Sequence, residues 1–99
     1  MEKEKRTRKF DAAARMLKAV AHPIRVEIVD LLSQTEKLSV NELREKLDIS
    51  QSMTSQHLAQ LRNTGVLGSV KEANVCYYYI ENKNVLKLLG CIKNCCSTK

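Results

Sequence analysis

The chain is 99 residues long and carries 17 lysine and arginine residues against 11 aspartate and glutamate residues, a formal net charge of +6. This length fits one domain and is too short for a barrel or a doubly wound nucleotide-binding fold. Hydrophobic residues make up 43% of the chain and charged residues 28%, a balance typical of globular proteins. The positive charge favours a polyanionic partner, either nucleic acid or an anionic membrane surface.

The apolar pattern argues against a membrane protein. No run of eighteen apolar residues occurs, and residues 1–9 are too charged for a signal peptide. We therefore expect a cytoplasmic protein with no membrane partner. In that reducing compartment the cysteines are expected to be free thiols, metal ligands or redox sensors rather than structural disulfides. The four cysteines are Cys76, Cys91, Cys95 and Cys96, and none forms a Cys-x-x-Cys pair of the zinc-finger kind.

The first third of the chain predicts a basic arm and two helices. Residues 1–9 carry five lysines and arginines and two glutamates, and form either the frayed start of a helix or a flexible arm that touches phosphate. From Phe10 to Ala21 apolar residues recur at helical spacing, and Pro23 ends this helix by disfavouring helical geometry at His22. Pro23 suits the first position of a second helix. Its wide apolar stripe, which indicates a heavily buried helix, comprises Ile24, Ile28, Leu31 and Leu32, flanked by Val26 and Val29.

The middle of the chain predicts two more helices with a short turn between them. Ser39 and Glu42 form a capping-box pattern that begins a helix of about eight residues. Ser50 caps the next helix, which spans residues 51–64 and ends at Gly65 in a left-handed conformation. Two helices joined by three or four residues are typical of a helix-turn-helix. The inward stripe of the second helix is expected to comprise Met53, His57, Leu58 and Leu61.

After Gly65 the side-chain period changes to two, which predicts a β-hairpin. Strands are expected over Val66–Lys71 and Val75–Ile80, with Asn74 at positive φ in the turn between them. Asn82 can cap a last helix. The predicted fold is therefore mainly α with a β-hairpin wing, a winged helix-turn-helix of four helices, two strands and a final helix. It spans residues 10–95, after the arm of residues 1–9 and before a tail of residues 96–99.

The first and last helices carry more apolar surface than so small a core needs. This surplus predicts a homodimer that forms through these two helices. The residues expected at the dimer interface are Phe10, Ala13, Leu17, Val85, Leu86, Leu89 and Ile92.

The helix over residues 51–63 carries side chains that suit DNA. Its outward face has short hydrogen-bonding groups, and no aspartate or glutamate occurs between Ile49 and Lys71. In a major groove, glutamine can bond adenine, serine can bond either base type, and an alanine methyl can touch thymine. The amides of the first helical turn suit phosphate. This pattern favours DNA binding over a face that is merely solvated.

Specific roles follow from these positions. Ser55 and Gln56 are predicted to read bases, and Arg62 and Lys71 to bind phosphate. The tyrosines Tyr77, Tyr78 and Tyr79 are interpreted as structural, with at least one face of the hairpin in the core. The full set of residues predicted to contact DNA is Ser50, Gln51, Ser52, Thr54, Ser55, Gln56, Arg62, Lys71 and Asn74.

Together these motifs resemble the ArsR/SmtB family of bacterial winged helix-turn-helix repressors. The resemblance implies a homodimer that binds palindromic promoter DNA and releases it on an inducing signal. It covers about residues 10–95. The segments that carry it are Leu17–Leu32, similar to the family's opening signature, Leu38–Leu43, similar to its third helix, Ser50–Leu67, similar to its recognition helix and exit, and Tyr78-Tyr79, similar to the end of its wing.

The metal sites that the resemblance implies are absent from this sequence. Ser39 and Asn41 stand where arsenic-type members have two cysteines, and residues 82–93 contain no histidine, aspartate or glutamate for a zinc site. His22 and His57 fall at framework positions and are expected to be structural. The sequence is therefore closer to metal-independent members, and no cofactor or resident metal is expected.

The remaining chemistry lies in the thiols. Cys91 and Cys95 share one face of the last helix, and with Cys96 and a partner copy they could form a site for a thiophilic metal or an oxidant. The alternative is that Cys91 packs as a small apolar residue and the other two belong to the tail. Cys76 is expected to pack within the wing.

Three classes of function were weighed. The favoured one is a sequence-specific, dimeric DNA-binding transcriptional regulator, acting as a repressor or an anti-repressor. The alternatives are a thiol-based metal or redox sensor, or metal-buffering protein, that acts through Cys91, Cys95 and Cys96, and a winged-helix module that binds proteins. An enzyme is not expected, because the sequence shows no paired carboxylates, no nucleophile with a base and no phosphate loop.

Overall fold

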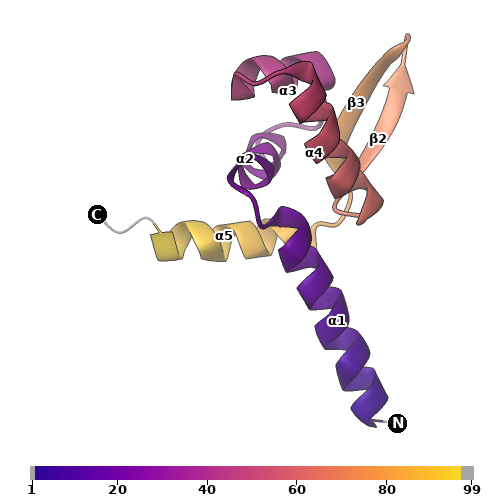
Figure 1. Cartoon of the computed structure of the whole chain (residues 1–99), viewed down its shortest axis with the longest axis vertical. Helices are drawn as coiled ribbons and strands as arrows, with labels where there is room; N and C mark the ends of the chain where they lie inside the picture. Colours follow the sequence, from indigo (N-terminus) through magenta and orange to yellow (C-terminus); the bar gives the residue numbers. More distant parts are fainter. Residues whose placement is uncertain (1, 97–99) are drawn as a thin grey trace.

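The computed structural model describes residues 2–96, and their side chains from residue 7 onward. It confirms a mainly helical fold with a β-hairpin wing (Figure 1). Helices α2, α3 and α4 and the sheet form the body of the protein, and α1 and α5 extend from it in different directions. The elements are α1 (Glu2–Val20), α2 (Pro23–Leu32), β1 (Leu38–Ser39), α3 (Val40–Leu47), α4 (Gln51–Asn63), β2 (Leu67–Glu72), β3 (Val75–Ile80) and α5 (Asn84–Cys96).

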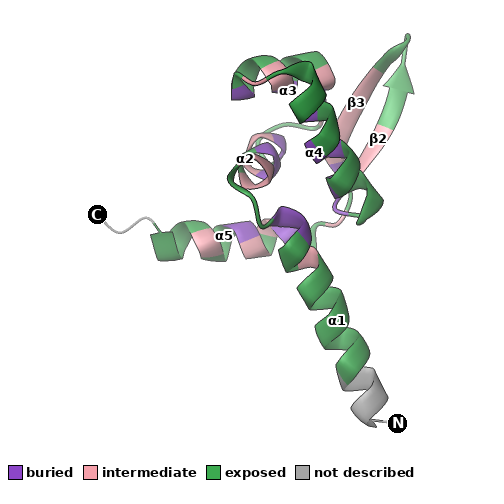
Figure 2. Ribbon diagram, viewed as in Figure 1, coloured by how far each residue is buried: buried purple, intermediate pink, exposed green. Residues whose placement is uncertain are grey.

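The first helix begins at Glu2, well before the start that the apolar pattern predicted at Phe10. Glutamate, lysine and arginine have high helix propensity, so the charged run extends the helix, and the predicted basic arm is helical from residue 2. Only the last turns of α1 reach the core, where Ala19 and Val20 are buried. Figure 2 shows that most of α1 is exposed. At the other end of the chain Cys96 closes α5, and the rest of the predicted tail lies outside the described residues.

The core is built around α2. Ile28, Val29 and Leu32 of this helix are at most 2% exposed, which confirms the prediction of a heavily buried second helix. Burying an aliphatic side chain of this size stabilises a fold by about 1.5–3 kcal/mol. The other helices, the three strands and the segment before β2 complete the core, through Leu38, Leu43, Leu47, Leu58, Leu61, Val66, Leu67, Ile80, Val85 and Leu89.

Side-chain caps fix the turn between α3 and α4. The Ser39 hydroxyl accepts a hydrogen bond from the Glu42 amide at 3.1 Å, and the Glu42 carboxylate accepts one from the Ser39 amide at 2.8 Å. This confirms the predicted capping box. The chain turns at Asp48, whose φ is 57°, and Ser50 caps α4 by accepting a hydrogen bond from the Met53 amide at 3.1 Å. Each cap contributes about 0.5–2 kcal/mol and sets the angle at which α4 leaves the turn.

The sheet has three antiparallel strands in the order β1-β3-β2. The hairpin of β2 and β3 was predicted, but β1 was not. Its two residues pair with Tyr77 and Tyr78 of β3 and tie the start of α3 to the wing. At the tip, Ala73 and Asn74 have φ values of 50° and 68°, as in a two-residue hairpin turn with mirror-image geometry. The predicted positive φ of Asn74 is confirmed.

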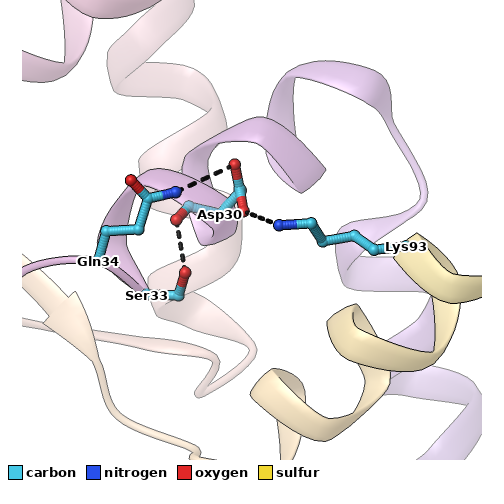
Figure 3. A network of polar contacts seen from close by, with 4 residues as sticks. All are labelled: Asp30, Ser33, Gln34 and Lys93. Atoms are coloured by element: carbon cyan, nitrogen blue, oxygen red, sulfur yellow. Dashed lines mark hydrogen bonds and ion pairs between the residues drawn. The ribbon is translucent and has the colours of Figure 1, made fainter. Parts of the chain in front are cut away.

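Apolar burial holds α5 against α2, and a polar network orients it (Figure 3). Lys93 Nζ lies 2.9 Å from Asp30 Oδ1, and the second carboxylate oxygen of Asp30 accepts a hydrogen bond from Gln34 Nε2 at 3.5 Å. An ion pair this exposed contributes little energy, about 0–1 kcal/mol. Val85 and Leu89 supply the burial, at 1% and 7% exposed. Both side chains are already packed in the core of their own chain, which leaves little of either for the predicted contact with a second copy.

Candidate nucleic-acid interface

Helix α4 has a buried inner face and an exposed outer face. The inner face comprises Thr54, His57, Leu58 and Leu61, all at most 9% exposed. The outer face is exposed and carries no charge until the last turn. Its members are Gln51, Ser52, Met53, Ser55, Gln56, Ala59, Gln60, Arg62 and Asn63.

For two neighbouring residues of α4, the burial is the reverse of what the sequence pattern predicted. Thr54 was expected to contact DNA, but it is fully buried and its hydroxyl donates a hydrogen bond to the Ser50 carbonyl at 2.8 Å. Its side chain is therefore unavailable to DNA. Met53 was expected in the core but is 44% exposed. The outer face thus gains a flexible apolar side chain one turn before Gln56.

A polar groove of about 200 Å³ lies between α3, the start of α4 and the wing. It brings Gln51 and Asn74 together, which were predicted separately. It also includes Asn41, which the site prediction missed although the capping box at Ser39 marked the start of its helix. The lining residues are Ser39, Val40, Asn41, Gln51, Asn74, Val75 and Cys76. The groove, the first turn of α4 and the tip of the wing therefore share one end of the molecule (Figure 1).

The first turn of α4 supplies hydrogen-bond donors at this end. The Ser50 hydroxyl occupies the Met53 amide, and helix geometry leaves the amides of Gln51 and Ser52 without intrahelical acceptors. These amides and the positive end of the helix dipole favour an anion such as a DNA phosphate.

The wing adds positive charge beside the groove. Lys71 is directly opposite Cys76 in the antiparallel register, so the two side chains lie on the same face of the hairpin. The neighbouring acid, Glu72, is neutralised because its carboxylate lies 2.6 Å from Lys37 Nζ. This hydrogen bond raises the pKa of Lys37. Lys71 forms neither of the two ion pairs found among the described residues.

Arg62 lies apart from the groove. It is in the last turn of α4, eleven residues or about 16 Å along the helix axis from Gln51. Its guanidinium is exposed and close enough to Tyr78 to oppose the rise in the pKa of that phenol, which burial and the neighbouring Cys76 cause. Arg62 and the groove residues therefore face different parts of any ligand that spans α4.

The three wing tyrosines contact their own chain, in line with their structural interpretation. Tyr78 packs against the core. Lys37 Nζ lies 4.9 Å from the centre of the Tyr77 ring. The Tyr79 ring crosses Gly68 so closely that a Cβ atom at that glycine would lie 2.5 Å from the ring. A Cβ atom at position 68 would therefore force the Tyr79 ring to move, and all three tyrosines are half-buried in their own chain.

The inner face of α4 is fixed by two histidines and an arginine. His57 Nδ1 accepts a hydrogen bond from Arg25 Nε at 3.1 Å, and the His57 ring centre lies 4.5 Å from that of His22. Burial, followed by the charges of His22 and Arg25, lowers the pKa of His57. His22 Nδ1 caps α2 by accepting a hydrogen bond from the Ile24 amide at 3.0 Å. Both histidines therefore position helices.

The thiols are free. Cys76 is half-buried, and Cys91, Cys95 and Cys96 are exposed on α5. Within residues 2–96 no group of three or more histidine, cysteine, aspartate or glutamate side chains is arranged to hold a metal ion. In the same part of the chain, no helix is long and apolar enough to cross a lipid bilayer.

Two capped helices joined at Asp48, an exposed polar face on the second of them and a β-hairpin wing beside it form a winged helix-turn-helix. The model of the bacterial regulatory proteins of the arsR family matches residues 22–69. The chain is 38% identical over 84 residues to the HTH-type transcriptional regulator YgaV of Escherichia coli, which covers 85% of each chain. This chain belongs to the ArsR family.

Solved structures agree with this assignment. Reduced HlyU of Vibrio cholerae superimposes with a TM-score of 0.84 at 32% identity, over 96% of this chain and 99% of that one. The homodimeric DNA-binding domain of Mb0332 from Mycobacterium bovis does so with a TM-score of 0.77 at 26% identity, over 88% of this chain and 80% of that one. The ArsR-family chain is thus a winged helix-turn-helix transcriptional regulator that binds DNA, and not an enzyme.

Proposed function

We propose that a homodimer of this chain binds palindromic promoter DNA, with the outer face of α4 in the major groove and the wing on the flanking backbone. The observation that carries this proposal is the exposed, acid-free surface formed by Ser52, Ser55, Gln56 and Ala59. A two-fold dimer binds two half-sites about one helical turn, or roughly 34–36 Å, apart.

The residues take distinct roles on the DNA. Gln56 and Ser55 contact base edges, and Gln56 has the amide geometry that recognises adenine. Lys71 and Asn74 at the wing and Arg62 at the far end of α4 bind phosphates. At the start of α4, Ser50, Gln51 and Ser52 bind phosphate, as the sequence predicted. Asn41, which lines the adjoining groove, is added to this set.

The second copy covers the apolar surface of α1 and α5. Phe10 is 65% exposed and Leu17 is 50% exposed, on a helix that contacts the body only at its end. On α5 the buried Val85 and Leu89 are replaced in this role by Leu88 and Ile92, which are half-buried beside Val26. The interface further includes Ala13 of α1 and Leu86 of α5. The DNA-binding domain of Mb0332 is homodimeric, which supports the same assembly here.

Occupation of a promoter determines the regulatory effect. A dimer bound to DNA excludes other proteins from the same base pairs, so it represses when it excludes polymerase and relieves repression when it excludes a repressor. We place the protein in the bacterial cytoplasm, where this DNA is found.

Selection of bound sequences from a random double-stranded DNA pool tests the proposal. The wild-type chain should enrich a two-fold symmetric site with half-sites about 34–36 Å apart. A Ser55→Ala/Gln56→Ala variant should enrich sites with relaxed preference within each half-site. A Gln34→Ala variant, changed in a loop distant from α4, is the matched control. Equal retention of all sequences by the wild type would contradict sequence-specific binding.

A thiol effector is the second candidate function. Cys91, Cys95 and Cys96 are exposed on the last turns of α5, the helix that also carries Ile92 of the proposed interface. A disulfide or a bridging thiophilic metal between copies would change the angle between the two α4 helices. A tenfold change in DNA affinity requires only about 1.4 kcal/mol of differential stability.

The test compares the wild type with a triple Cys→Ser variant at positions 91, 95 and 96. DNA affinity is measured under reducing conditions, under oxidising conditions, and with zinc, cadmium or arsenite. A response of the wild type that the triple variant loses assigns the effector to these thiols. Equal affinity of the wild type in every condition rules the thiol effector out and leaves DNA binding itself intact. A response that persists in the triple variant assigns it to Cys76 or to another part of the chain.

A further inference from the structure

A cluster of three positive charges lies away from the groove and the tip of the wing. A cleft of about 220 Å³ is enclosed by the end of α1, the start of α2 and the end of α4. Three cationic side chains line it, together with an amide and a hydroxyl. The lining residues are Arg15, Lys18, Ala19, Arg25, Gln60 and Thr64.

These cations have no acidic partner in the described structure. The ion pairs found within residues 2–96 join Lys37 to Glu72 and Lys93 to Asp30. Helix α4 contains no acid, and the lining of the cleft contains none. The ends of α1 and α4 each contribute about half a negative charge to the cleft, and the start of α2 contributes about half a positive charge. With the three cationic side chains, the net charge at the cleft is about +2.5.

Arg25 is held in place before any ligand binds. Its Nε donates to His57 Nδ1 at 3.1 Å, and its Nη1 donates to the Ala19 carbonyl at 3.1 Å. A guanidinium has five N–H donors, so three remain for a ligand. A planar guanidinium that is already ordered binds oxyanions through paired hydrogen bonds at a small entropic cost.

We propose that this cleft is a binding site for a small polyvalent phosphate anion, recognised by Arg15, Lys18 and Arg25. The cleft is smaller than the roughly 300–1,000 Å³ of a site for a drug-sized molecule, so it suits an anion of the size of phosphate or pyrophosphate. The phosphates of DNA are the other source of this chemistry. Arg25 fixes the cleft to the inner side of α4 through its hydrogen bond to the buried His57, whereas the α4 residues that we propose to contact DNA are exposed on the outer face. We therefore assign the cleft to a free anion.

Calorimetric titration of the full chain with pyrophosphate, in the absence of DNA, tests the site. At about 0.15 M salt the Debye length is about 8 Å, so distant charges contribute little. The wild type should bind one pyrophosphate per chain, saturably. An Arg15→Gln/Lys18→Gln variant should bind it at least about tenfold more weakly, because two charge-assisted hydrogen bonds are lost. Both positions are exposed, so the fold is retained.

The matched control is Arg8→Gln/Lys9→Gln, which removes the same charge from exposed positions earlier on α1. Its affinity for pyrophosphate should change by less than about twofold, because screening weakens distant charges. Equal losses in the two double variants, or no saturable binding by the wild type, would overturn the proposal. If the wild type shows no saturable pyrophosphate binding and Arg15→Gln/Lys18→Gln also loses DNA affinity, the cleft would be assigned to DNA phosphates instead.

The chain has two histidines, and the titration of His57 can report whether the anion binds beside Arg25. Burial and the charges of His22 and Arg25 lower the pKa of His57. An anion bound to Arg25 offsets part of that charge, so saturating pyrophosphate should raise the pKa of His57 measured by NMR titration. Binding that leaves the His57 titration unchanged would place the anion elsewhere and overturn the assignment. Because no DNA is present, failure here is distinct from failure of the proposed regulatory function.

Discussion

Helices α1 and α4 expose opposite kinds of surface. On α4 Leu58 and Leu61 are fully buried, and the surface left to solvent is mostly polar and acid-free. On α1 only the last turns are buried, and Phe10 and Leu17 are left to solvent. Figure 2 shows the contrast, with buried segments along α4 and an exposed α1.

The difference indicates different missing partners. An isolated helix derives little stability from its own hydrogen bonds, so most of α1 needs packing against another apolar surface. We propose that a second copy of the chain supplies it. Helix α4 is already packed, and its polar face suits a polar ligand such as the edges of base pairs. Assembly and DNA recognition therefore use separate faces, and a substitution can damage one while sparing the other.

The largest effect is expected on the inner face of α4. Leu58→Ala should lower the free energy of unfolding by about 2–5 kcal/mol, because Leu58 is fully buried and a cavity remains. Met53→Ala on the same helix should cost about 0.5 kcal/mol or less, because Met53 is 44% exposed. Urea unfolding of the two variants measures the contrast. Equal losses would mean that Met53 is part of the core after all.

The exposed face of α1 should determine the oligomeric state. A dimer buries Phe10 from both copies, and each ring contributes about 1.5–3 kcal/mol. Phe10→Ala should therefore raise the dimer Kd by about two orders of magnitude or more, measured by sedimentation equilibrium. The control Lys9→Ala should leave Kd within about threefold. A wild-type chain that sediments as a monomer at micromolar concentration would contradict both the proposed homodimer and its binding to palindromic DNA.

The wing should contribute to affinity without contributing to sequence preference. Lys71→Ala should weaken binding to all DNA sequences alike and reduce the slope of log affinity against log salt by about one per copy. Lys87→Ala removes the same charge from exposed α5 and should leave the slope unchanged. A change in preferred sequence with Lys71→Ala would show that the wing reads bases.

The smallest effect concerns the pH dependence of stability. Burial, then His22 and Arg25, lower the pKa of His57 below its ordinary value of 6.5, so the unfolded chain takes up this proton more readily than the folded chain. The free energy of unfolding should therefore fall as pH decreases through 6.5, until the folded chain also binds the proton. His57→Gln should flatten this dependence in urea titrations at several pH values. An unchanged slope would assign it to other groups.

The sequence predicted the elements that local patterns specify. The caps at Ser39 and Ser50, the helix start at Pro23 and the positive φ of Asn74 were all predicted and are confirmed, because each depends on a few adjacent residues. Strand β1 was missed because two residues show no periodicity, and it exists only through its pairing with β3.

Burial was harder to predict than secondary structure. Hydrophobicity placed Met53 inside and Thr54 outside, but Thr54 satisfies its hydroxyl on the Ser50 carbonyl and is therefore buried at little cost. Val85 and Leu89 were expected at an interface because periodicity identifies an apolar face without identifying what covers it. Asn41 was missed as a groove residue because the sequence does not show that α3 lies beside the wing in the folded chain.

The affinity of the Gln56→Ala variant for the selected DNA site tests the central claim most directly. Fluorescence anisotropy with wild type, Gln56→Ala and the control Gln34→Ala measures it, and sedimentation confirms equal assembly. The account predicts a loss of about 1–3 kcal/mol for Gln56→Ala, relaxed preference at one base pair of each half-site, and an unchanged dimer. Unchanged affinity and preference would contradict the assignment of the outer face of α4 as the surface that reads DNA.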